Sequence, residues 1–501
     1  MNIKISYKLT ILFLVVVGLF LRLWHIEFGL PHSFHADEPE IAELAIKYTY
    51  EIRDVVKNNN WYKLIPISFV YGTVPTYFNT FLTMAFSKSL GILNIPFKKH
   101  HIYIFLRSVN AVLSFVIVPV IAYLYYKLFK NKTGALITFA LLALNWKLIV
   151  HAHYINVDIF QTIFLALSFL TLYLYYERGP DNKYTVLTGI LFGLAVGTKI
   201  TTLIGLPLYF YVFLAKKDPR GLFGFFFVIV ATFMATNPFS MIFATDFAFR
   251  IYTMFTKEAG MVFDSVDSGL FKYLFALSFT VTLPVLLLSL YGKLKTKCNP
   301  FHKFLIGYVV VYLIFFSLQS RRVDRWLLPI IPIIILYASH ALVELKKYWW
   351  VIVFGLYCYY PFLLLQQFKK HTPKSEAYLW MRDNVAPSLN KLSYTEEGLD
   401  PMNKLPGMRV VRMEVYSEQN AHYFMPENAD GYDYVVTASK PMSNHKRSEV
   451  REAYPFYYER WNAWENNLHD PTKWELVKDF TLPKPNLVNL SDIHIYKNLS
   501  L

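Results

Sequence analysis

The chain has few charged residues and little cysteine for its length. Of its 501 residues, 17% are charged and 55% are hydrophobic, and the mean hydropathy is +0.32. An ordinary soluble domain is less apolar than this. The apolar residues form blocks long enough to cross a bilayer, such as residues 10–26, 221–243 and 348–366. The composition therefore predicts an integral membrane protein.

Several common motifs are also missing. The only two cysteines, Cys298 and Cys358, lie beside or inside apolar segments, so the sequence contains no disulfide framework and no CxxC metal site. It also contains no internal repeat and no GxGxxG, GKS or GKT phosphate loop. The chemistry must therefore come from residues outside these motifs.

Acidic residues are outnumbered by basic ones, and the net charge is +15. In a soluble protein such an excess suggests nucleic-acid binding. Here Lys and Arg lie in short loops between apolar blocks, where they act as topology signals beside anionic lipids. We therefore expect membrane lipids as partners, and no nucleic acid.

Eleven apolar segments are predicted to span the membrane. The first follows Lys4 and Lys8 without a small-residue cleavage pattern, which indicates an uncleaved helix. The segments are residues 9–28, 103–126, 134–151, 157–176, 184–198, 201–215, 221–243, 270–291, 303–318, 327–343 and 348–366.

A further apolar segment, residues 69–93, contains several polar residues and decides the topology. If it does not span, the basic clusters all lie in cytoplasmic loops, and the opposite loops near residues 152–156 and 199–200 are almost bare. The positive-inside rule therefore favours an interfacial or re-entrant element. The N-terminus is then cytoplasmic and the C-terminus external, and we expect the plasma membrane of a prokaryote. The clusters are Lys127/Lys130/Lys132, Arg178/Lys183, Lys216/Lys217/Arg220, Lys293/Lys295/Lys297 and Lys346/Lys347.

The predicted fold is an α-helical polytopic membrane protein with a C-terminal α/β domain outside the membrane. Residues 1–366 form the transmembrane domain, including a long outer loop at residues 29–102, and residues 367–501 form the soluble domain. Within the soluble domain we expect strands at residues 409–416, 432–439, 474–480 and 492–497, and helices near residues 375–385 and 445–466.

Unusual polar residues fall on the predicted outer side of the membrane. Charges at a membrane boundary are costly, so their convergence on one side suggests function. They are Asp37 and Glu38 after the first span, His151, His153 and Asp158 at the next outer junction, Lys199, and Arg321, Arg322, Asp324 and Arg325.

Structural explanations compete with functional ones at several of these positions. Asp37 could be a helix N-cap, because Pro39 and an amphipathic pattern follow it. His151 and His153 are two residues apart, which is weak evidence for a metal site and favours hydrogen bonding. Asp158 at a helix start is favourably placed against the helix dipole.

The combination of an acid with a cationic cluster suits sugar transfer from a lipid phosphate. The leaving phosphate needs cations to stabilise its charge, and the acceptor hydroxyl needs a base. We expect Lys199 and Arg325 to bind that phosphate, with Arg107, Arg321 and Arg322 as further candidates. A single base opposite the phosphate would invert the anomeric centre, unlike the two-carboxylate arrangement of hydrolases.

These motifs resemble the protein O-mannosyltransferase-like branch of the GT-C glycosyltransferase superfamily, which also includes the lipid A aminoarabinose transferases. The resemblance covers most of the chain. It rests on FHADEP, on Phe69 to Gly72 with Pro75 and Tyr77, on Arg107-Ser108, on HAHYINVD and GLAVGTK, on Asn237-Pro238-Phe239, and on Arg325-Trp326 with Pro329, where Trp replaces the family's Tyr.

The resemblance implies a polyprenyl-phosphate monosaccharide donor and no nucleotide sugar at the active site. It implies Asp37 as the base, and we give Glu38 a supporting role at the catalytic site. His153, Asp158, Tyr71 and Tyr77 are the substrate-binding candidates.

The acceptor stays open between a glycan, a lipid and a protein. No cofactor is certain, and a divalent metal remains open, because His35, His151, His153 and the acids could assemble a site. The alternative functions are a transporter or flippase, and a ligase or polymerase that uses a lipid-diphosphate oligosaccharide.

Overall fold

The computed structural model describes most of the chain: residues 7–33, 35, 37–66, 69, 71–92, 98–256, 269–319, 323–385, 391–395, 399, 402, 405–413, 430–439, 448–453 and 455–500. These residues divide into two compact units. The first contains Met1–Ile26, Asp37–Ala259 and Asp267–Leu365, and the second is formed mainly by Gln366–Leu501 with Glu27–Ala36.

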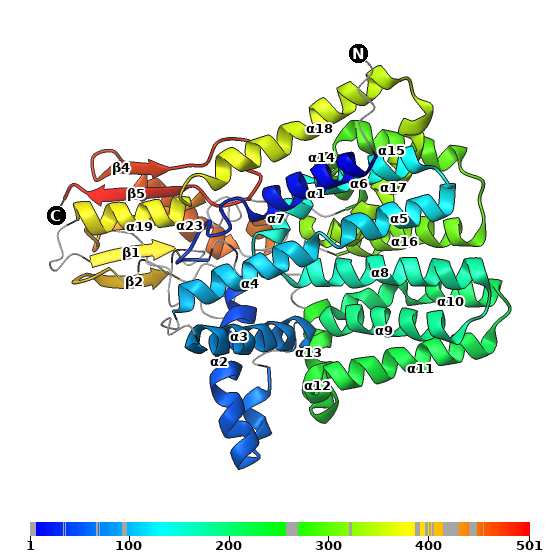
Figure 1. Ribbon diagram of the computed structural model, residues 1–501. Coiled ribbons are helices and arrows are strands. Elements are labelled where there is room, and N and C mark those ends of the chain that lie inside the picture. The colour runs from blue at the N-terminus through cyan, green and yellow to red at the C-terminus, as the bar shows by residue number, and fades with distance from the viewer. Residues whose placement is uncertain are drawn as a thin grey trace. The chain divides into compact units, whose positions relative to one another are not determined.

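The first unit is built of helices (Figure 1). Their bounds are α1 Tyr7–Leu23, α2 Asp37–Asn58, η1 Trp61–Leu64, α3 Val74–Ile92, α4 Lys99–Ser114, α5 Ile117–Phe129, α6 Lys132–Ala143, α7 Trp146–Ala152, α8 Val157–Arg178, α9 Asn182–Thr198, η2 Ile200–Gly205, α10 Leu206–Ala215, α11 Pro219–Thr236, α12 Pro238–Ile242, α13 Ala244–Thr256, α14 Leu270–Thr280, α15 Leu283–Lys295, α16 Pro300–Ser317, η4 Asp324–Ile330, α17 Ile331–Glu344 and α18 Lys347–Phe368.

Polar caps in the basic loops begin several of these helices. The side chains of Asn131, Asp181, Asp218 and Asn299 each accept a hydrogen bond from a backbone N–H in the first turn of the following helix. Such caps satisfy donors that the helix itself leaves unpaired. The loops that carry the basic clusters therefore also set where the long apolar helices start.

The core of the first unit is an apolar bundle in which α8, α9 and α11 lie side by side (Figure 1). An arginine is nevertheless buried in it. Arg22, near the end of α1, is fully buried and donates from Nη1 to the carbonyl oxygens of Gly18 at 3.0 Å and Ala143 at 2.9 Å. It therefore satisfies the last carbonyl of α6, where the chain bends into α7.

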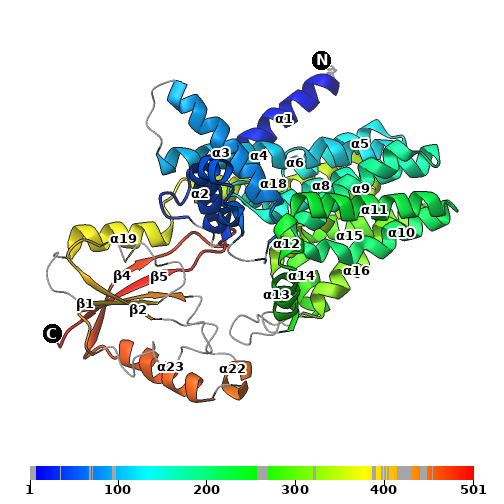
Figure 2. The same ribbon diagram turned by 90° about the horizontal axis from the view of Figure 1, so that it is seen from below.

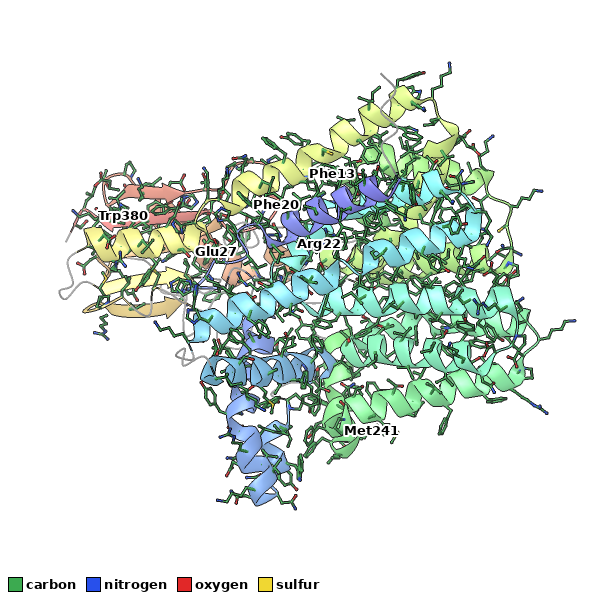
Figure 3. The ribbon with its side chains drawn as sticks, in the orientation of Figure 1. Phe13, Phe20, Arg22, Glu27, Met241 and Trp380 are labelled. Atoms are coloured by element: carbon green, nitrogen blue, oxygen red, sulfur yellow. The ribbon has the colours of Figure 1, made fainter. Side chains whose placement is uncertain are left out.

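The outward side of α1 is apolar instead. Figure 3 labels Phe13 and Phe20 along this helix, and both rings are exposed, at 64% and 47%. Exposed apolar side chains along a long helix are the surface that lipid would contact. Together with the many apolar helices, this confirms an integral membrane protein.

Each predicted span coincides with a helix or a broken helix pair. Within the described residues, six helices are long and apolar enough to cross a membrane, or eight if each of two bent pairs is one span. Helices α1 and α9 have 17 residues each, about 25 Å, which is short for a hydrocarbon core of about 30 Å. The count of eleven stays a prediction.

The predicted outer loop contains two long helices, α2 and α3, which pack against each other. The ambiguous apolar segment, residues 69–93, corresponds to α3. Two buried threonines, Thr80 and Thr83, and Asn79 donate to carbonyls four residues earlier within it, as Thr83 does to Asn79 at 2.8 Å. Its polar side chains are thus satisfied internally, which suits an apolar surrounding.

The second unit contains a five-stranded sheet in the order β2-β1-β3-β5-β4. Strands β2, β1 and β3 are parallel, whereas β5 pairs antiparallel with both β3 and β4. The strands are β1 Lys391–Thr395, β2 Arg409–Met413, β3 Tyr434–Ala438, β4 Trp474–Phe480 and β5 Ile493–Asn498, and the helices are α19 Pro373–Asn384, α22 Ser448–Ala453 and α23 Pro455–Leu468.

Helices cover both faces of this sheet, with α19 on one side and α23 on the other (Figure 2). Neighbouring residues of β3 point to opposite faces: Val435 packs with Trp461 and Trp464, whereas Val436 packs in the cluster of Met381. The predicted α/β character is confirmed, and so are the four expected strands. Strand β1 was not predicted.

Candidate functional site

The site is centred on Asp37, the first residue of α2. Its Oδ2 atom accepts a hydrogen bond from the Tyr71 hydroxyl at 2.8 Å and lies 2.7 Å from Nη2 of Arg325. The side chains of Asp37 and Arg325 are 21% and 18% exposed. Both groups are therefore held in place and still accessible to a substrate.

Asp158 connects Arg325 to a second cation. It lies in the first turn of α8 with only 1% of its side chain exposed. One carboxylate oxygen lies 2.5 Å from Nζ of Lys199, and the other lies 3.4 Å from Nε of Arg325. The result is a continuous chain of contacts, Tyr71–Asp37–Arg325–Asp158–Lys199, assembled from five separate parts of the sequence.

Burial controls the protonation of two members of this chain. It raises the pKa of Tyr71, and the neighbouring Asp37 raises it further, so the hydroxyl stays protonated and donates to Asp37. Burial lowers the pKa of Lys199, and the Asp158 carboxylate opposes that shift. The Lys199 ammonium also lies 5.6 Å from the centre of the Trp326 ring, close enough for a cation–π contact.

Glu38, next to Asp37, has a different environment. Its carboxylate and the guanidinium of Arg107 form a two-point pair at 2.7 and 2.6 Å, and both side chains are completely buried. Glu38 also accepts from the backbone N–H of Ile155, and Arg107 donates to the carbonyl of Ile26. This pair joins α2, α4, the end of α1 and the segment before α8.

Gly72 and Gly197 allow the short segment of residues 71–73, called the Tyr71 segment below, to lie against the end of α9. A Cβ atom on Gly72 would lie 1.8 Å from the carbonyl oxygen of Gly197, and the Gly72 N–H donates to Thr198 at 3.1 Å. A Cβ on Gly197 would in turn lie 2.6 Å from Nδ2 of Asn237. Only glycine permits this approach, which places Tyr71 near Lys199.

The Asn237 side chain fastens the same segment. Its Oδ1 accepts from the backbone N–H of Thr73 at 2.8 Å. Sequence reasoning noted Asn237 only as part of an Asn-Pro turn and gave it no role. The signal available was an Asn at the end of an apolar helix, before Pro238, where its side chain can reach another backbone.

Three other predicted residues lie elsewhere in the first unit. His153 is fully buried and bonds to the carbonyls of Ile149 at 2.8 Å and Trp24 at 2.9 Å. His151 contacts Asn156 at 2.8 Å. The Tyr77 hydroxyl donates to the carbonyl of Leu64 at 3.4 Å, within the loop that carries α2 and α3.

Two of the remaining candidates, Arg321 and Arg322, fall outside the described residues. Among the residues that are described, no group of three or more His, Cys, Asp or Glu side chains is arranged to hold a metal ion. Two acids of the contact chain, Asp37 and Asp158, are bridged by the Arg325 guanidinium.

The fold and part of the sequence match known proteins. Residues 12–216 match the model of the dolichyl-phosphate-mannose-protein mannosyltransferase family. The whole fold is similar to ArnT from Cupriavidus metallidurans bound to undecaprenyl phosphate, with a TM-score of 0.56 and 12% identity over 97% of both chains. The chain therefore has the helical membrane fold of the GT-C type, and its N-terminal part is similar to this mannosyltransferase family.

A second solved structure agrees with this assignment. The oligosaccharyltransferase of Archaeoglobus fulgidus, in its apo form, is similar with a TM-score of 0.56 and 13% identity, over 90% of this chain and 72% of that chain. At such identities the likeness concerns the fold. No curated protein sequence matches this chain. The GT-C resemblance found in the sequence motifs is thereby confirmed.

Proposed function

We propose that this glycosyltransferase moves a monosaccharide from a polyprenyl-phosphate donor to an acceptor hydroxyl, on the outer face of the membrane and with inversion. The observation that carries the proposal is the contact chain from Asp37 through Arg325 and Asp158 to Lys199. It puts one accessible carboxylate beside two cations at the ends of apolar helices. A lipid-linked phosphate would reach such a place while its tail stays in the bilayer.

Arg325 and Lys199 are the groups that bind the donor phosphate in this proposal. A guanidinium has five N–H donors, so Arg325 can keep its contacts with Asp37 and Asp158 and bind phosphate oxygens with the remaining donors. Asp158 is a positioning residue, because it touches both cations but is itself almost fully buried. As the bond to the sugar breaks, both cations stabilise the charge that develops on the phosphate.

Asp37 is the base that takes the proton from the acceptor hydroxyl. Its partners, Tyr71 and Arg325, fix the orientation of the carboxylate. Transfer in one displacement forms the bond from the acceptor oxygen to the anomeric carbon and breaks the bond to the phosphate oxygen. The proton goes to Asp37, and the polyprenyl phosphate leaves.

Glu38 and Arg107 hold the site together in this proposal and do not touch the substrate. Both are completely buried and satisfy each other's charges. They thus differ from Asp37, although Glu38 is its neighbour in the chain. Adjacent residues on a helix point to different sides, which separates the two acids.

The test uses purified protein in lipid nanodiscs and radiolabelled undecaprenyl-phosphate monosaccharides. A set with mannose, glucose, galactose and aminoarabinose, incubated with a membrane glycolipid extract, should give labelled product and free undecaprenyl phosphate for at least one sugar. Consumption of lipid-diphosphate oligosaccharides alone would favour the ligase alternative. Movement of donor across the bilayer without any glycosidic bond change would favour a flippase.

A further inference from the structure

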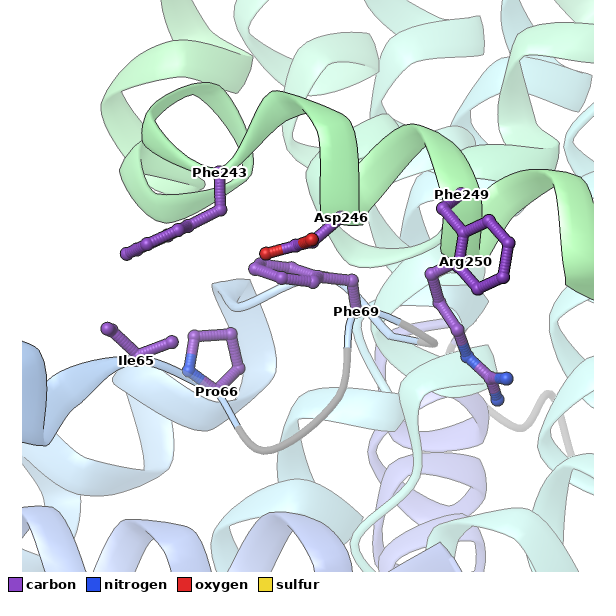
Figure 4. Close-up of a pocket in the computed structure, with 7 residues that line it drawn as sticks. All are labelled: Ile65, Pro66, Phe69, Phe243, Asp246, Phe249 and Arg250. Carbon is purple, nitrogen blue, oxygen red and sulfur yellow. The ribbon is translucent and has the colours of Figure 1, made fainter.

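The first unit contains a half-open cavity beside the Tyr71 segment, and it holds none of the catalytic residues (Figure 4). Its volume is about 540 Å³, within the usual range for sites that bind small molecules. It is lined by Ile65, Pro66, Phe69, Phe243, Asp246, Phe249 and Arg250. The first three lie in the segment between η1 and α3. Phe243 directly follows α12, and the other three lie in α13.

The cavity is lined by five apolar side chains and two charged ones, Asp246 and Arg250. Figure 4 shows the Phe243 ring on one side and Ile65 and Pro66 on the opposite side. The Phe69 ring packs edge-on against Phe247 of α13, with 5.9 Å between ring centres. This contact attaches the loop wall to the helix wall.

The same loop connects the cavity to the site. Phe69 precedes Tyr71 by two residues, a span of at most about 7 Å along an extended backbone. Tyr71 in turn donates to Asp37. Beyond it, Thr73 is bonded to Asn237, directly before α12 begins at Pro238. The cavity and the base are thus held by one short stretch of chain that is fixed at both ends.

The polar groups in the cavity suit a neutral molecule rich in hydroxyl groups. Asp246 only accepts hydrogen bonds and Arg250 only donates them, whereas a hydroxyl does both. A phosphate or another anion would face the Asp246 carboxylate, and a cation would face the Arg250 guanidinium. Aromatic and aliphatic walls can contact the C–H faces of a sugar ring. The lining consists of helix and loop residues and offers no strand edge for an extended peptide.

We propose that this cavity binds a neutral sugar of a saccharide acceptor and so brings the acceptor hydroxyl towards Asp37. The proposal rests on the function proposed above, because it assumes that Asp37 is the base. The substrate class it assigns is a glycan, and not a protein. Phe243 provides the stacking surface, and Asp246 and Arg250 bind hydroxyl groups.

The test measures binding separately from turnover. The wild-type protein in nanodiscs is titrated with the methyl α-glycosides of mannose, glucose and galactose, and binding is followed by saturation-transfer difference NMR. Phe243→Ala and Asp246→Leu should each raise the dissociation constant of the bound glycoside about tenfold, since each removes a direct contact. Tyr252→Ala is the matched control, because Tyr252 is an exposed aromatic residue of α13 that does not line the cavity.

The outcomes separate this proposal from the function on which it rests. No glycoside binding to the wild type, or equal binding to the wild type and both cavity variants, overturns the cavity assignment. So does a Ser/Thr-rich peptide that binds the wild type and loses affinity in the same variants. Asp37→Asn should still bind glycoside. Donor consumption that does not depend on Asp37 would instead refute the catalytic proposal and leave the binding result standing.

Discussion

At the scale of single residues, the neighbouring acids Asp37 and Glu38 have different environments. Asp37 is partly exposed and contacts Tyr71 and Arg325, whereas Glu38 is fully buried against Arg107. Accessibility decides between them, because a base must reach the acceptor while a structural charge must be shielded and paired.

Replacing Asp37 tests the base. Asp37→Asn keeps the size and much of the hydrogen bonding but removes basicity, so turnover should fall roughly a hundredfold or more. Donor binding and folding should be largely kept. The matched control is Asp54→Asn, in the same helix, where an exposed carboxylate pairs with Lys63. Normal turnover by the Asp37 variant would move the base to Asp158 or Glu38.

Replacing Glu38 should affect stability instead. Glu38→Gln leaves the buried Arg107 guanidinium without its countercharge, which typically costs about 3–5 kcal/mol. Thermal unfolding in detergent should therefore occur at a clearly lower temperature. Combining it with Arg107→Met should recover part of the loss, since the buried charge is then removed. A Glu38 variant with full stability and lost turnover would make Glu38 catalytic.

Replacing Arg325 tests its proposed role in binding the donor phosphate. Arg325→Ala should raise the donor KM and lower kcat, because the guanidinium contacts both Asp37 and Asp158 and would bind the leaving phosphate. Arg325→Lys should recover only part of the activity, since an ammonium cannot replace a planar fork. Steady-state kinetics with varied donor give both constants. Unchanged constants in both variants would remove Arg325 from the site.

At the scale of elements, the site depends on close backbone approach. The Tyr71 segment, the end of α9 and the end of α11 meet at Gly72, Gly197 and Asn237. No side chain there does chemistry, yet the contact sets the distance between Tyr71 and the cations. Loops of this kind are positioned by the rigid helices that flank them.

Gly72→Ala tests this contact. Its new Cβ would lie 1.8 Å from the Gly197 carbonyl, so the segment must move away from α9. A displacement of about 1 Å at a catalytic site can cost about a hundredfold in rate. Gly91→Ala is the control, because nothing lies within 4 Å of its Cβ position in α3. Equal turnover in the two variants would show that this approach does not set the site.

At the scale of the whole molecule, the charged residues of the contact chain and those of the basic loops are separated along the helices. Helix α8 begins beside Asp158 and ends at Arg178, and α9 begins near Lys183 and ends before Lys199. The contact chain and the basic loops therefore lie at opposite ends of the same helices. From the positive-inside rule we expect the site end to be external.

Topology mapping tests that placement. A reporter fused after residue 366 should be external, and a cysteine introduced beside Lys130 should react with an impermeant reagent only from the cytoplasm. The exposed Cys298 and Cys358 must first be replaced. An internal reporter would reverse the orientation, and the site would then face the cytoplasm.

The sequence by itself determined the class of protein, the helices and most residues of the candidate site, whose roles stay predictions. Long apolar runs can be satisfied only as helices in a bilayer, and charges at their ends are rare enough to be noticed. Residue type and position alone therefore indicated Asp37, Asp158, Lys199 and Arg325 as candidates. The order of the motifs indicated the resemblance to the family.

Only the tertiary structure decided which of these residues touch. Spacing along the chain does not tell whether Asp37 or Glu38 contacts Arg325. It also does not tell that Arg107 pairs with Glu38. Pairing across helices depends on how side chains pack in three dimensions. Strand β1 was not predicted for a related reason. Its five residues are too few to show a clear alternation of apolar and polar side chains, and it forms a strand because it pairs with β2 and β3.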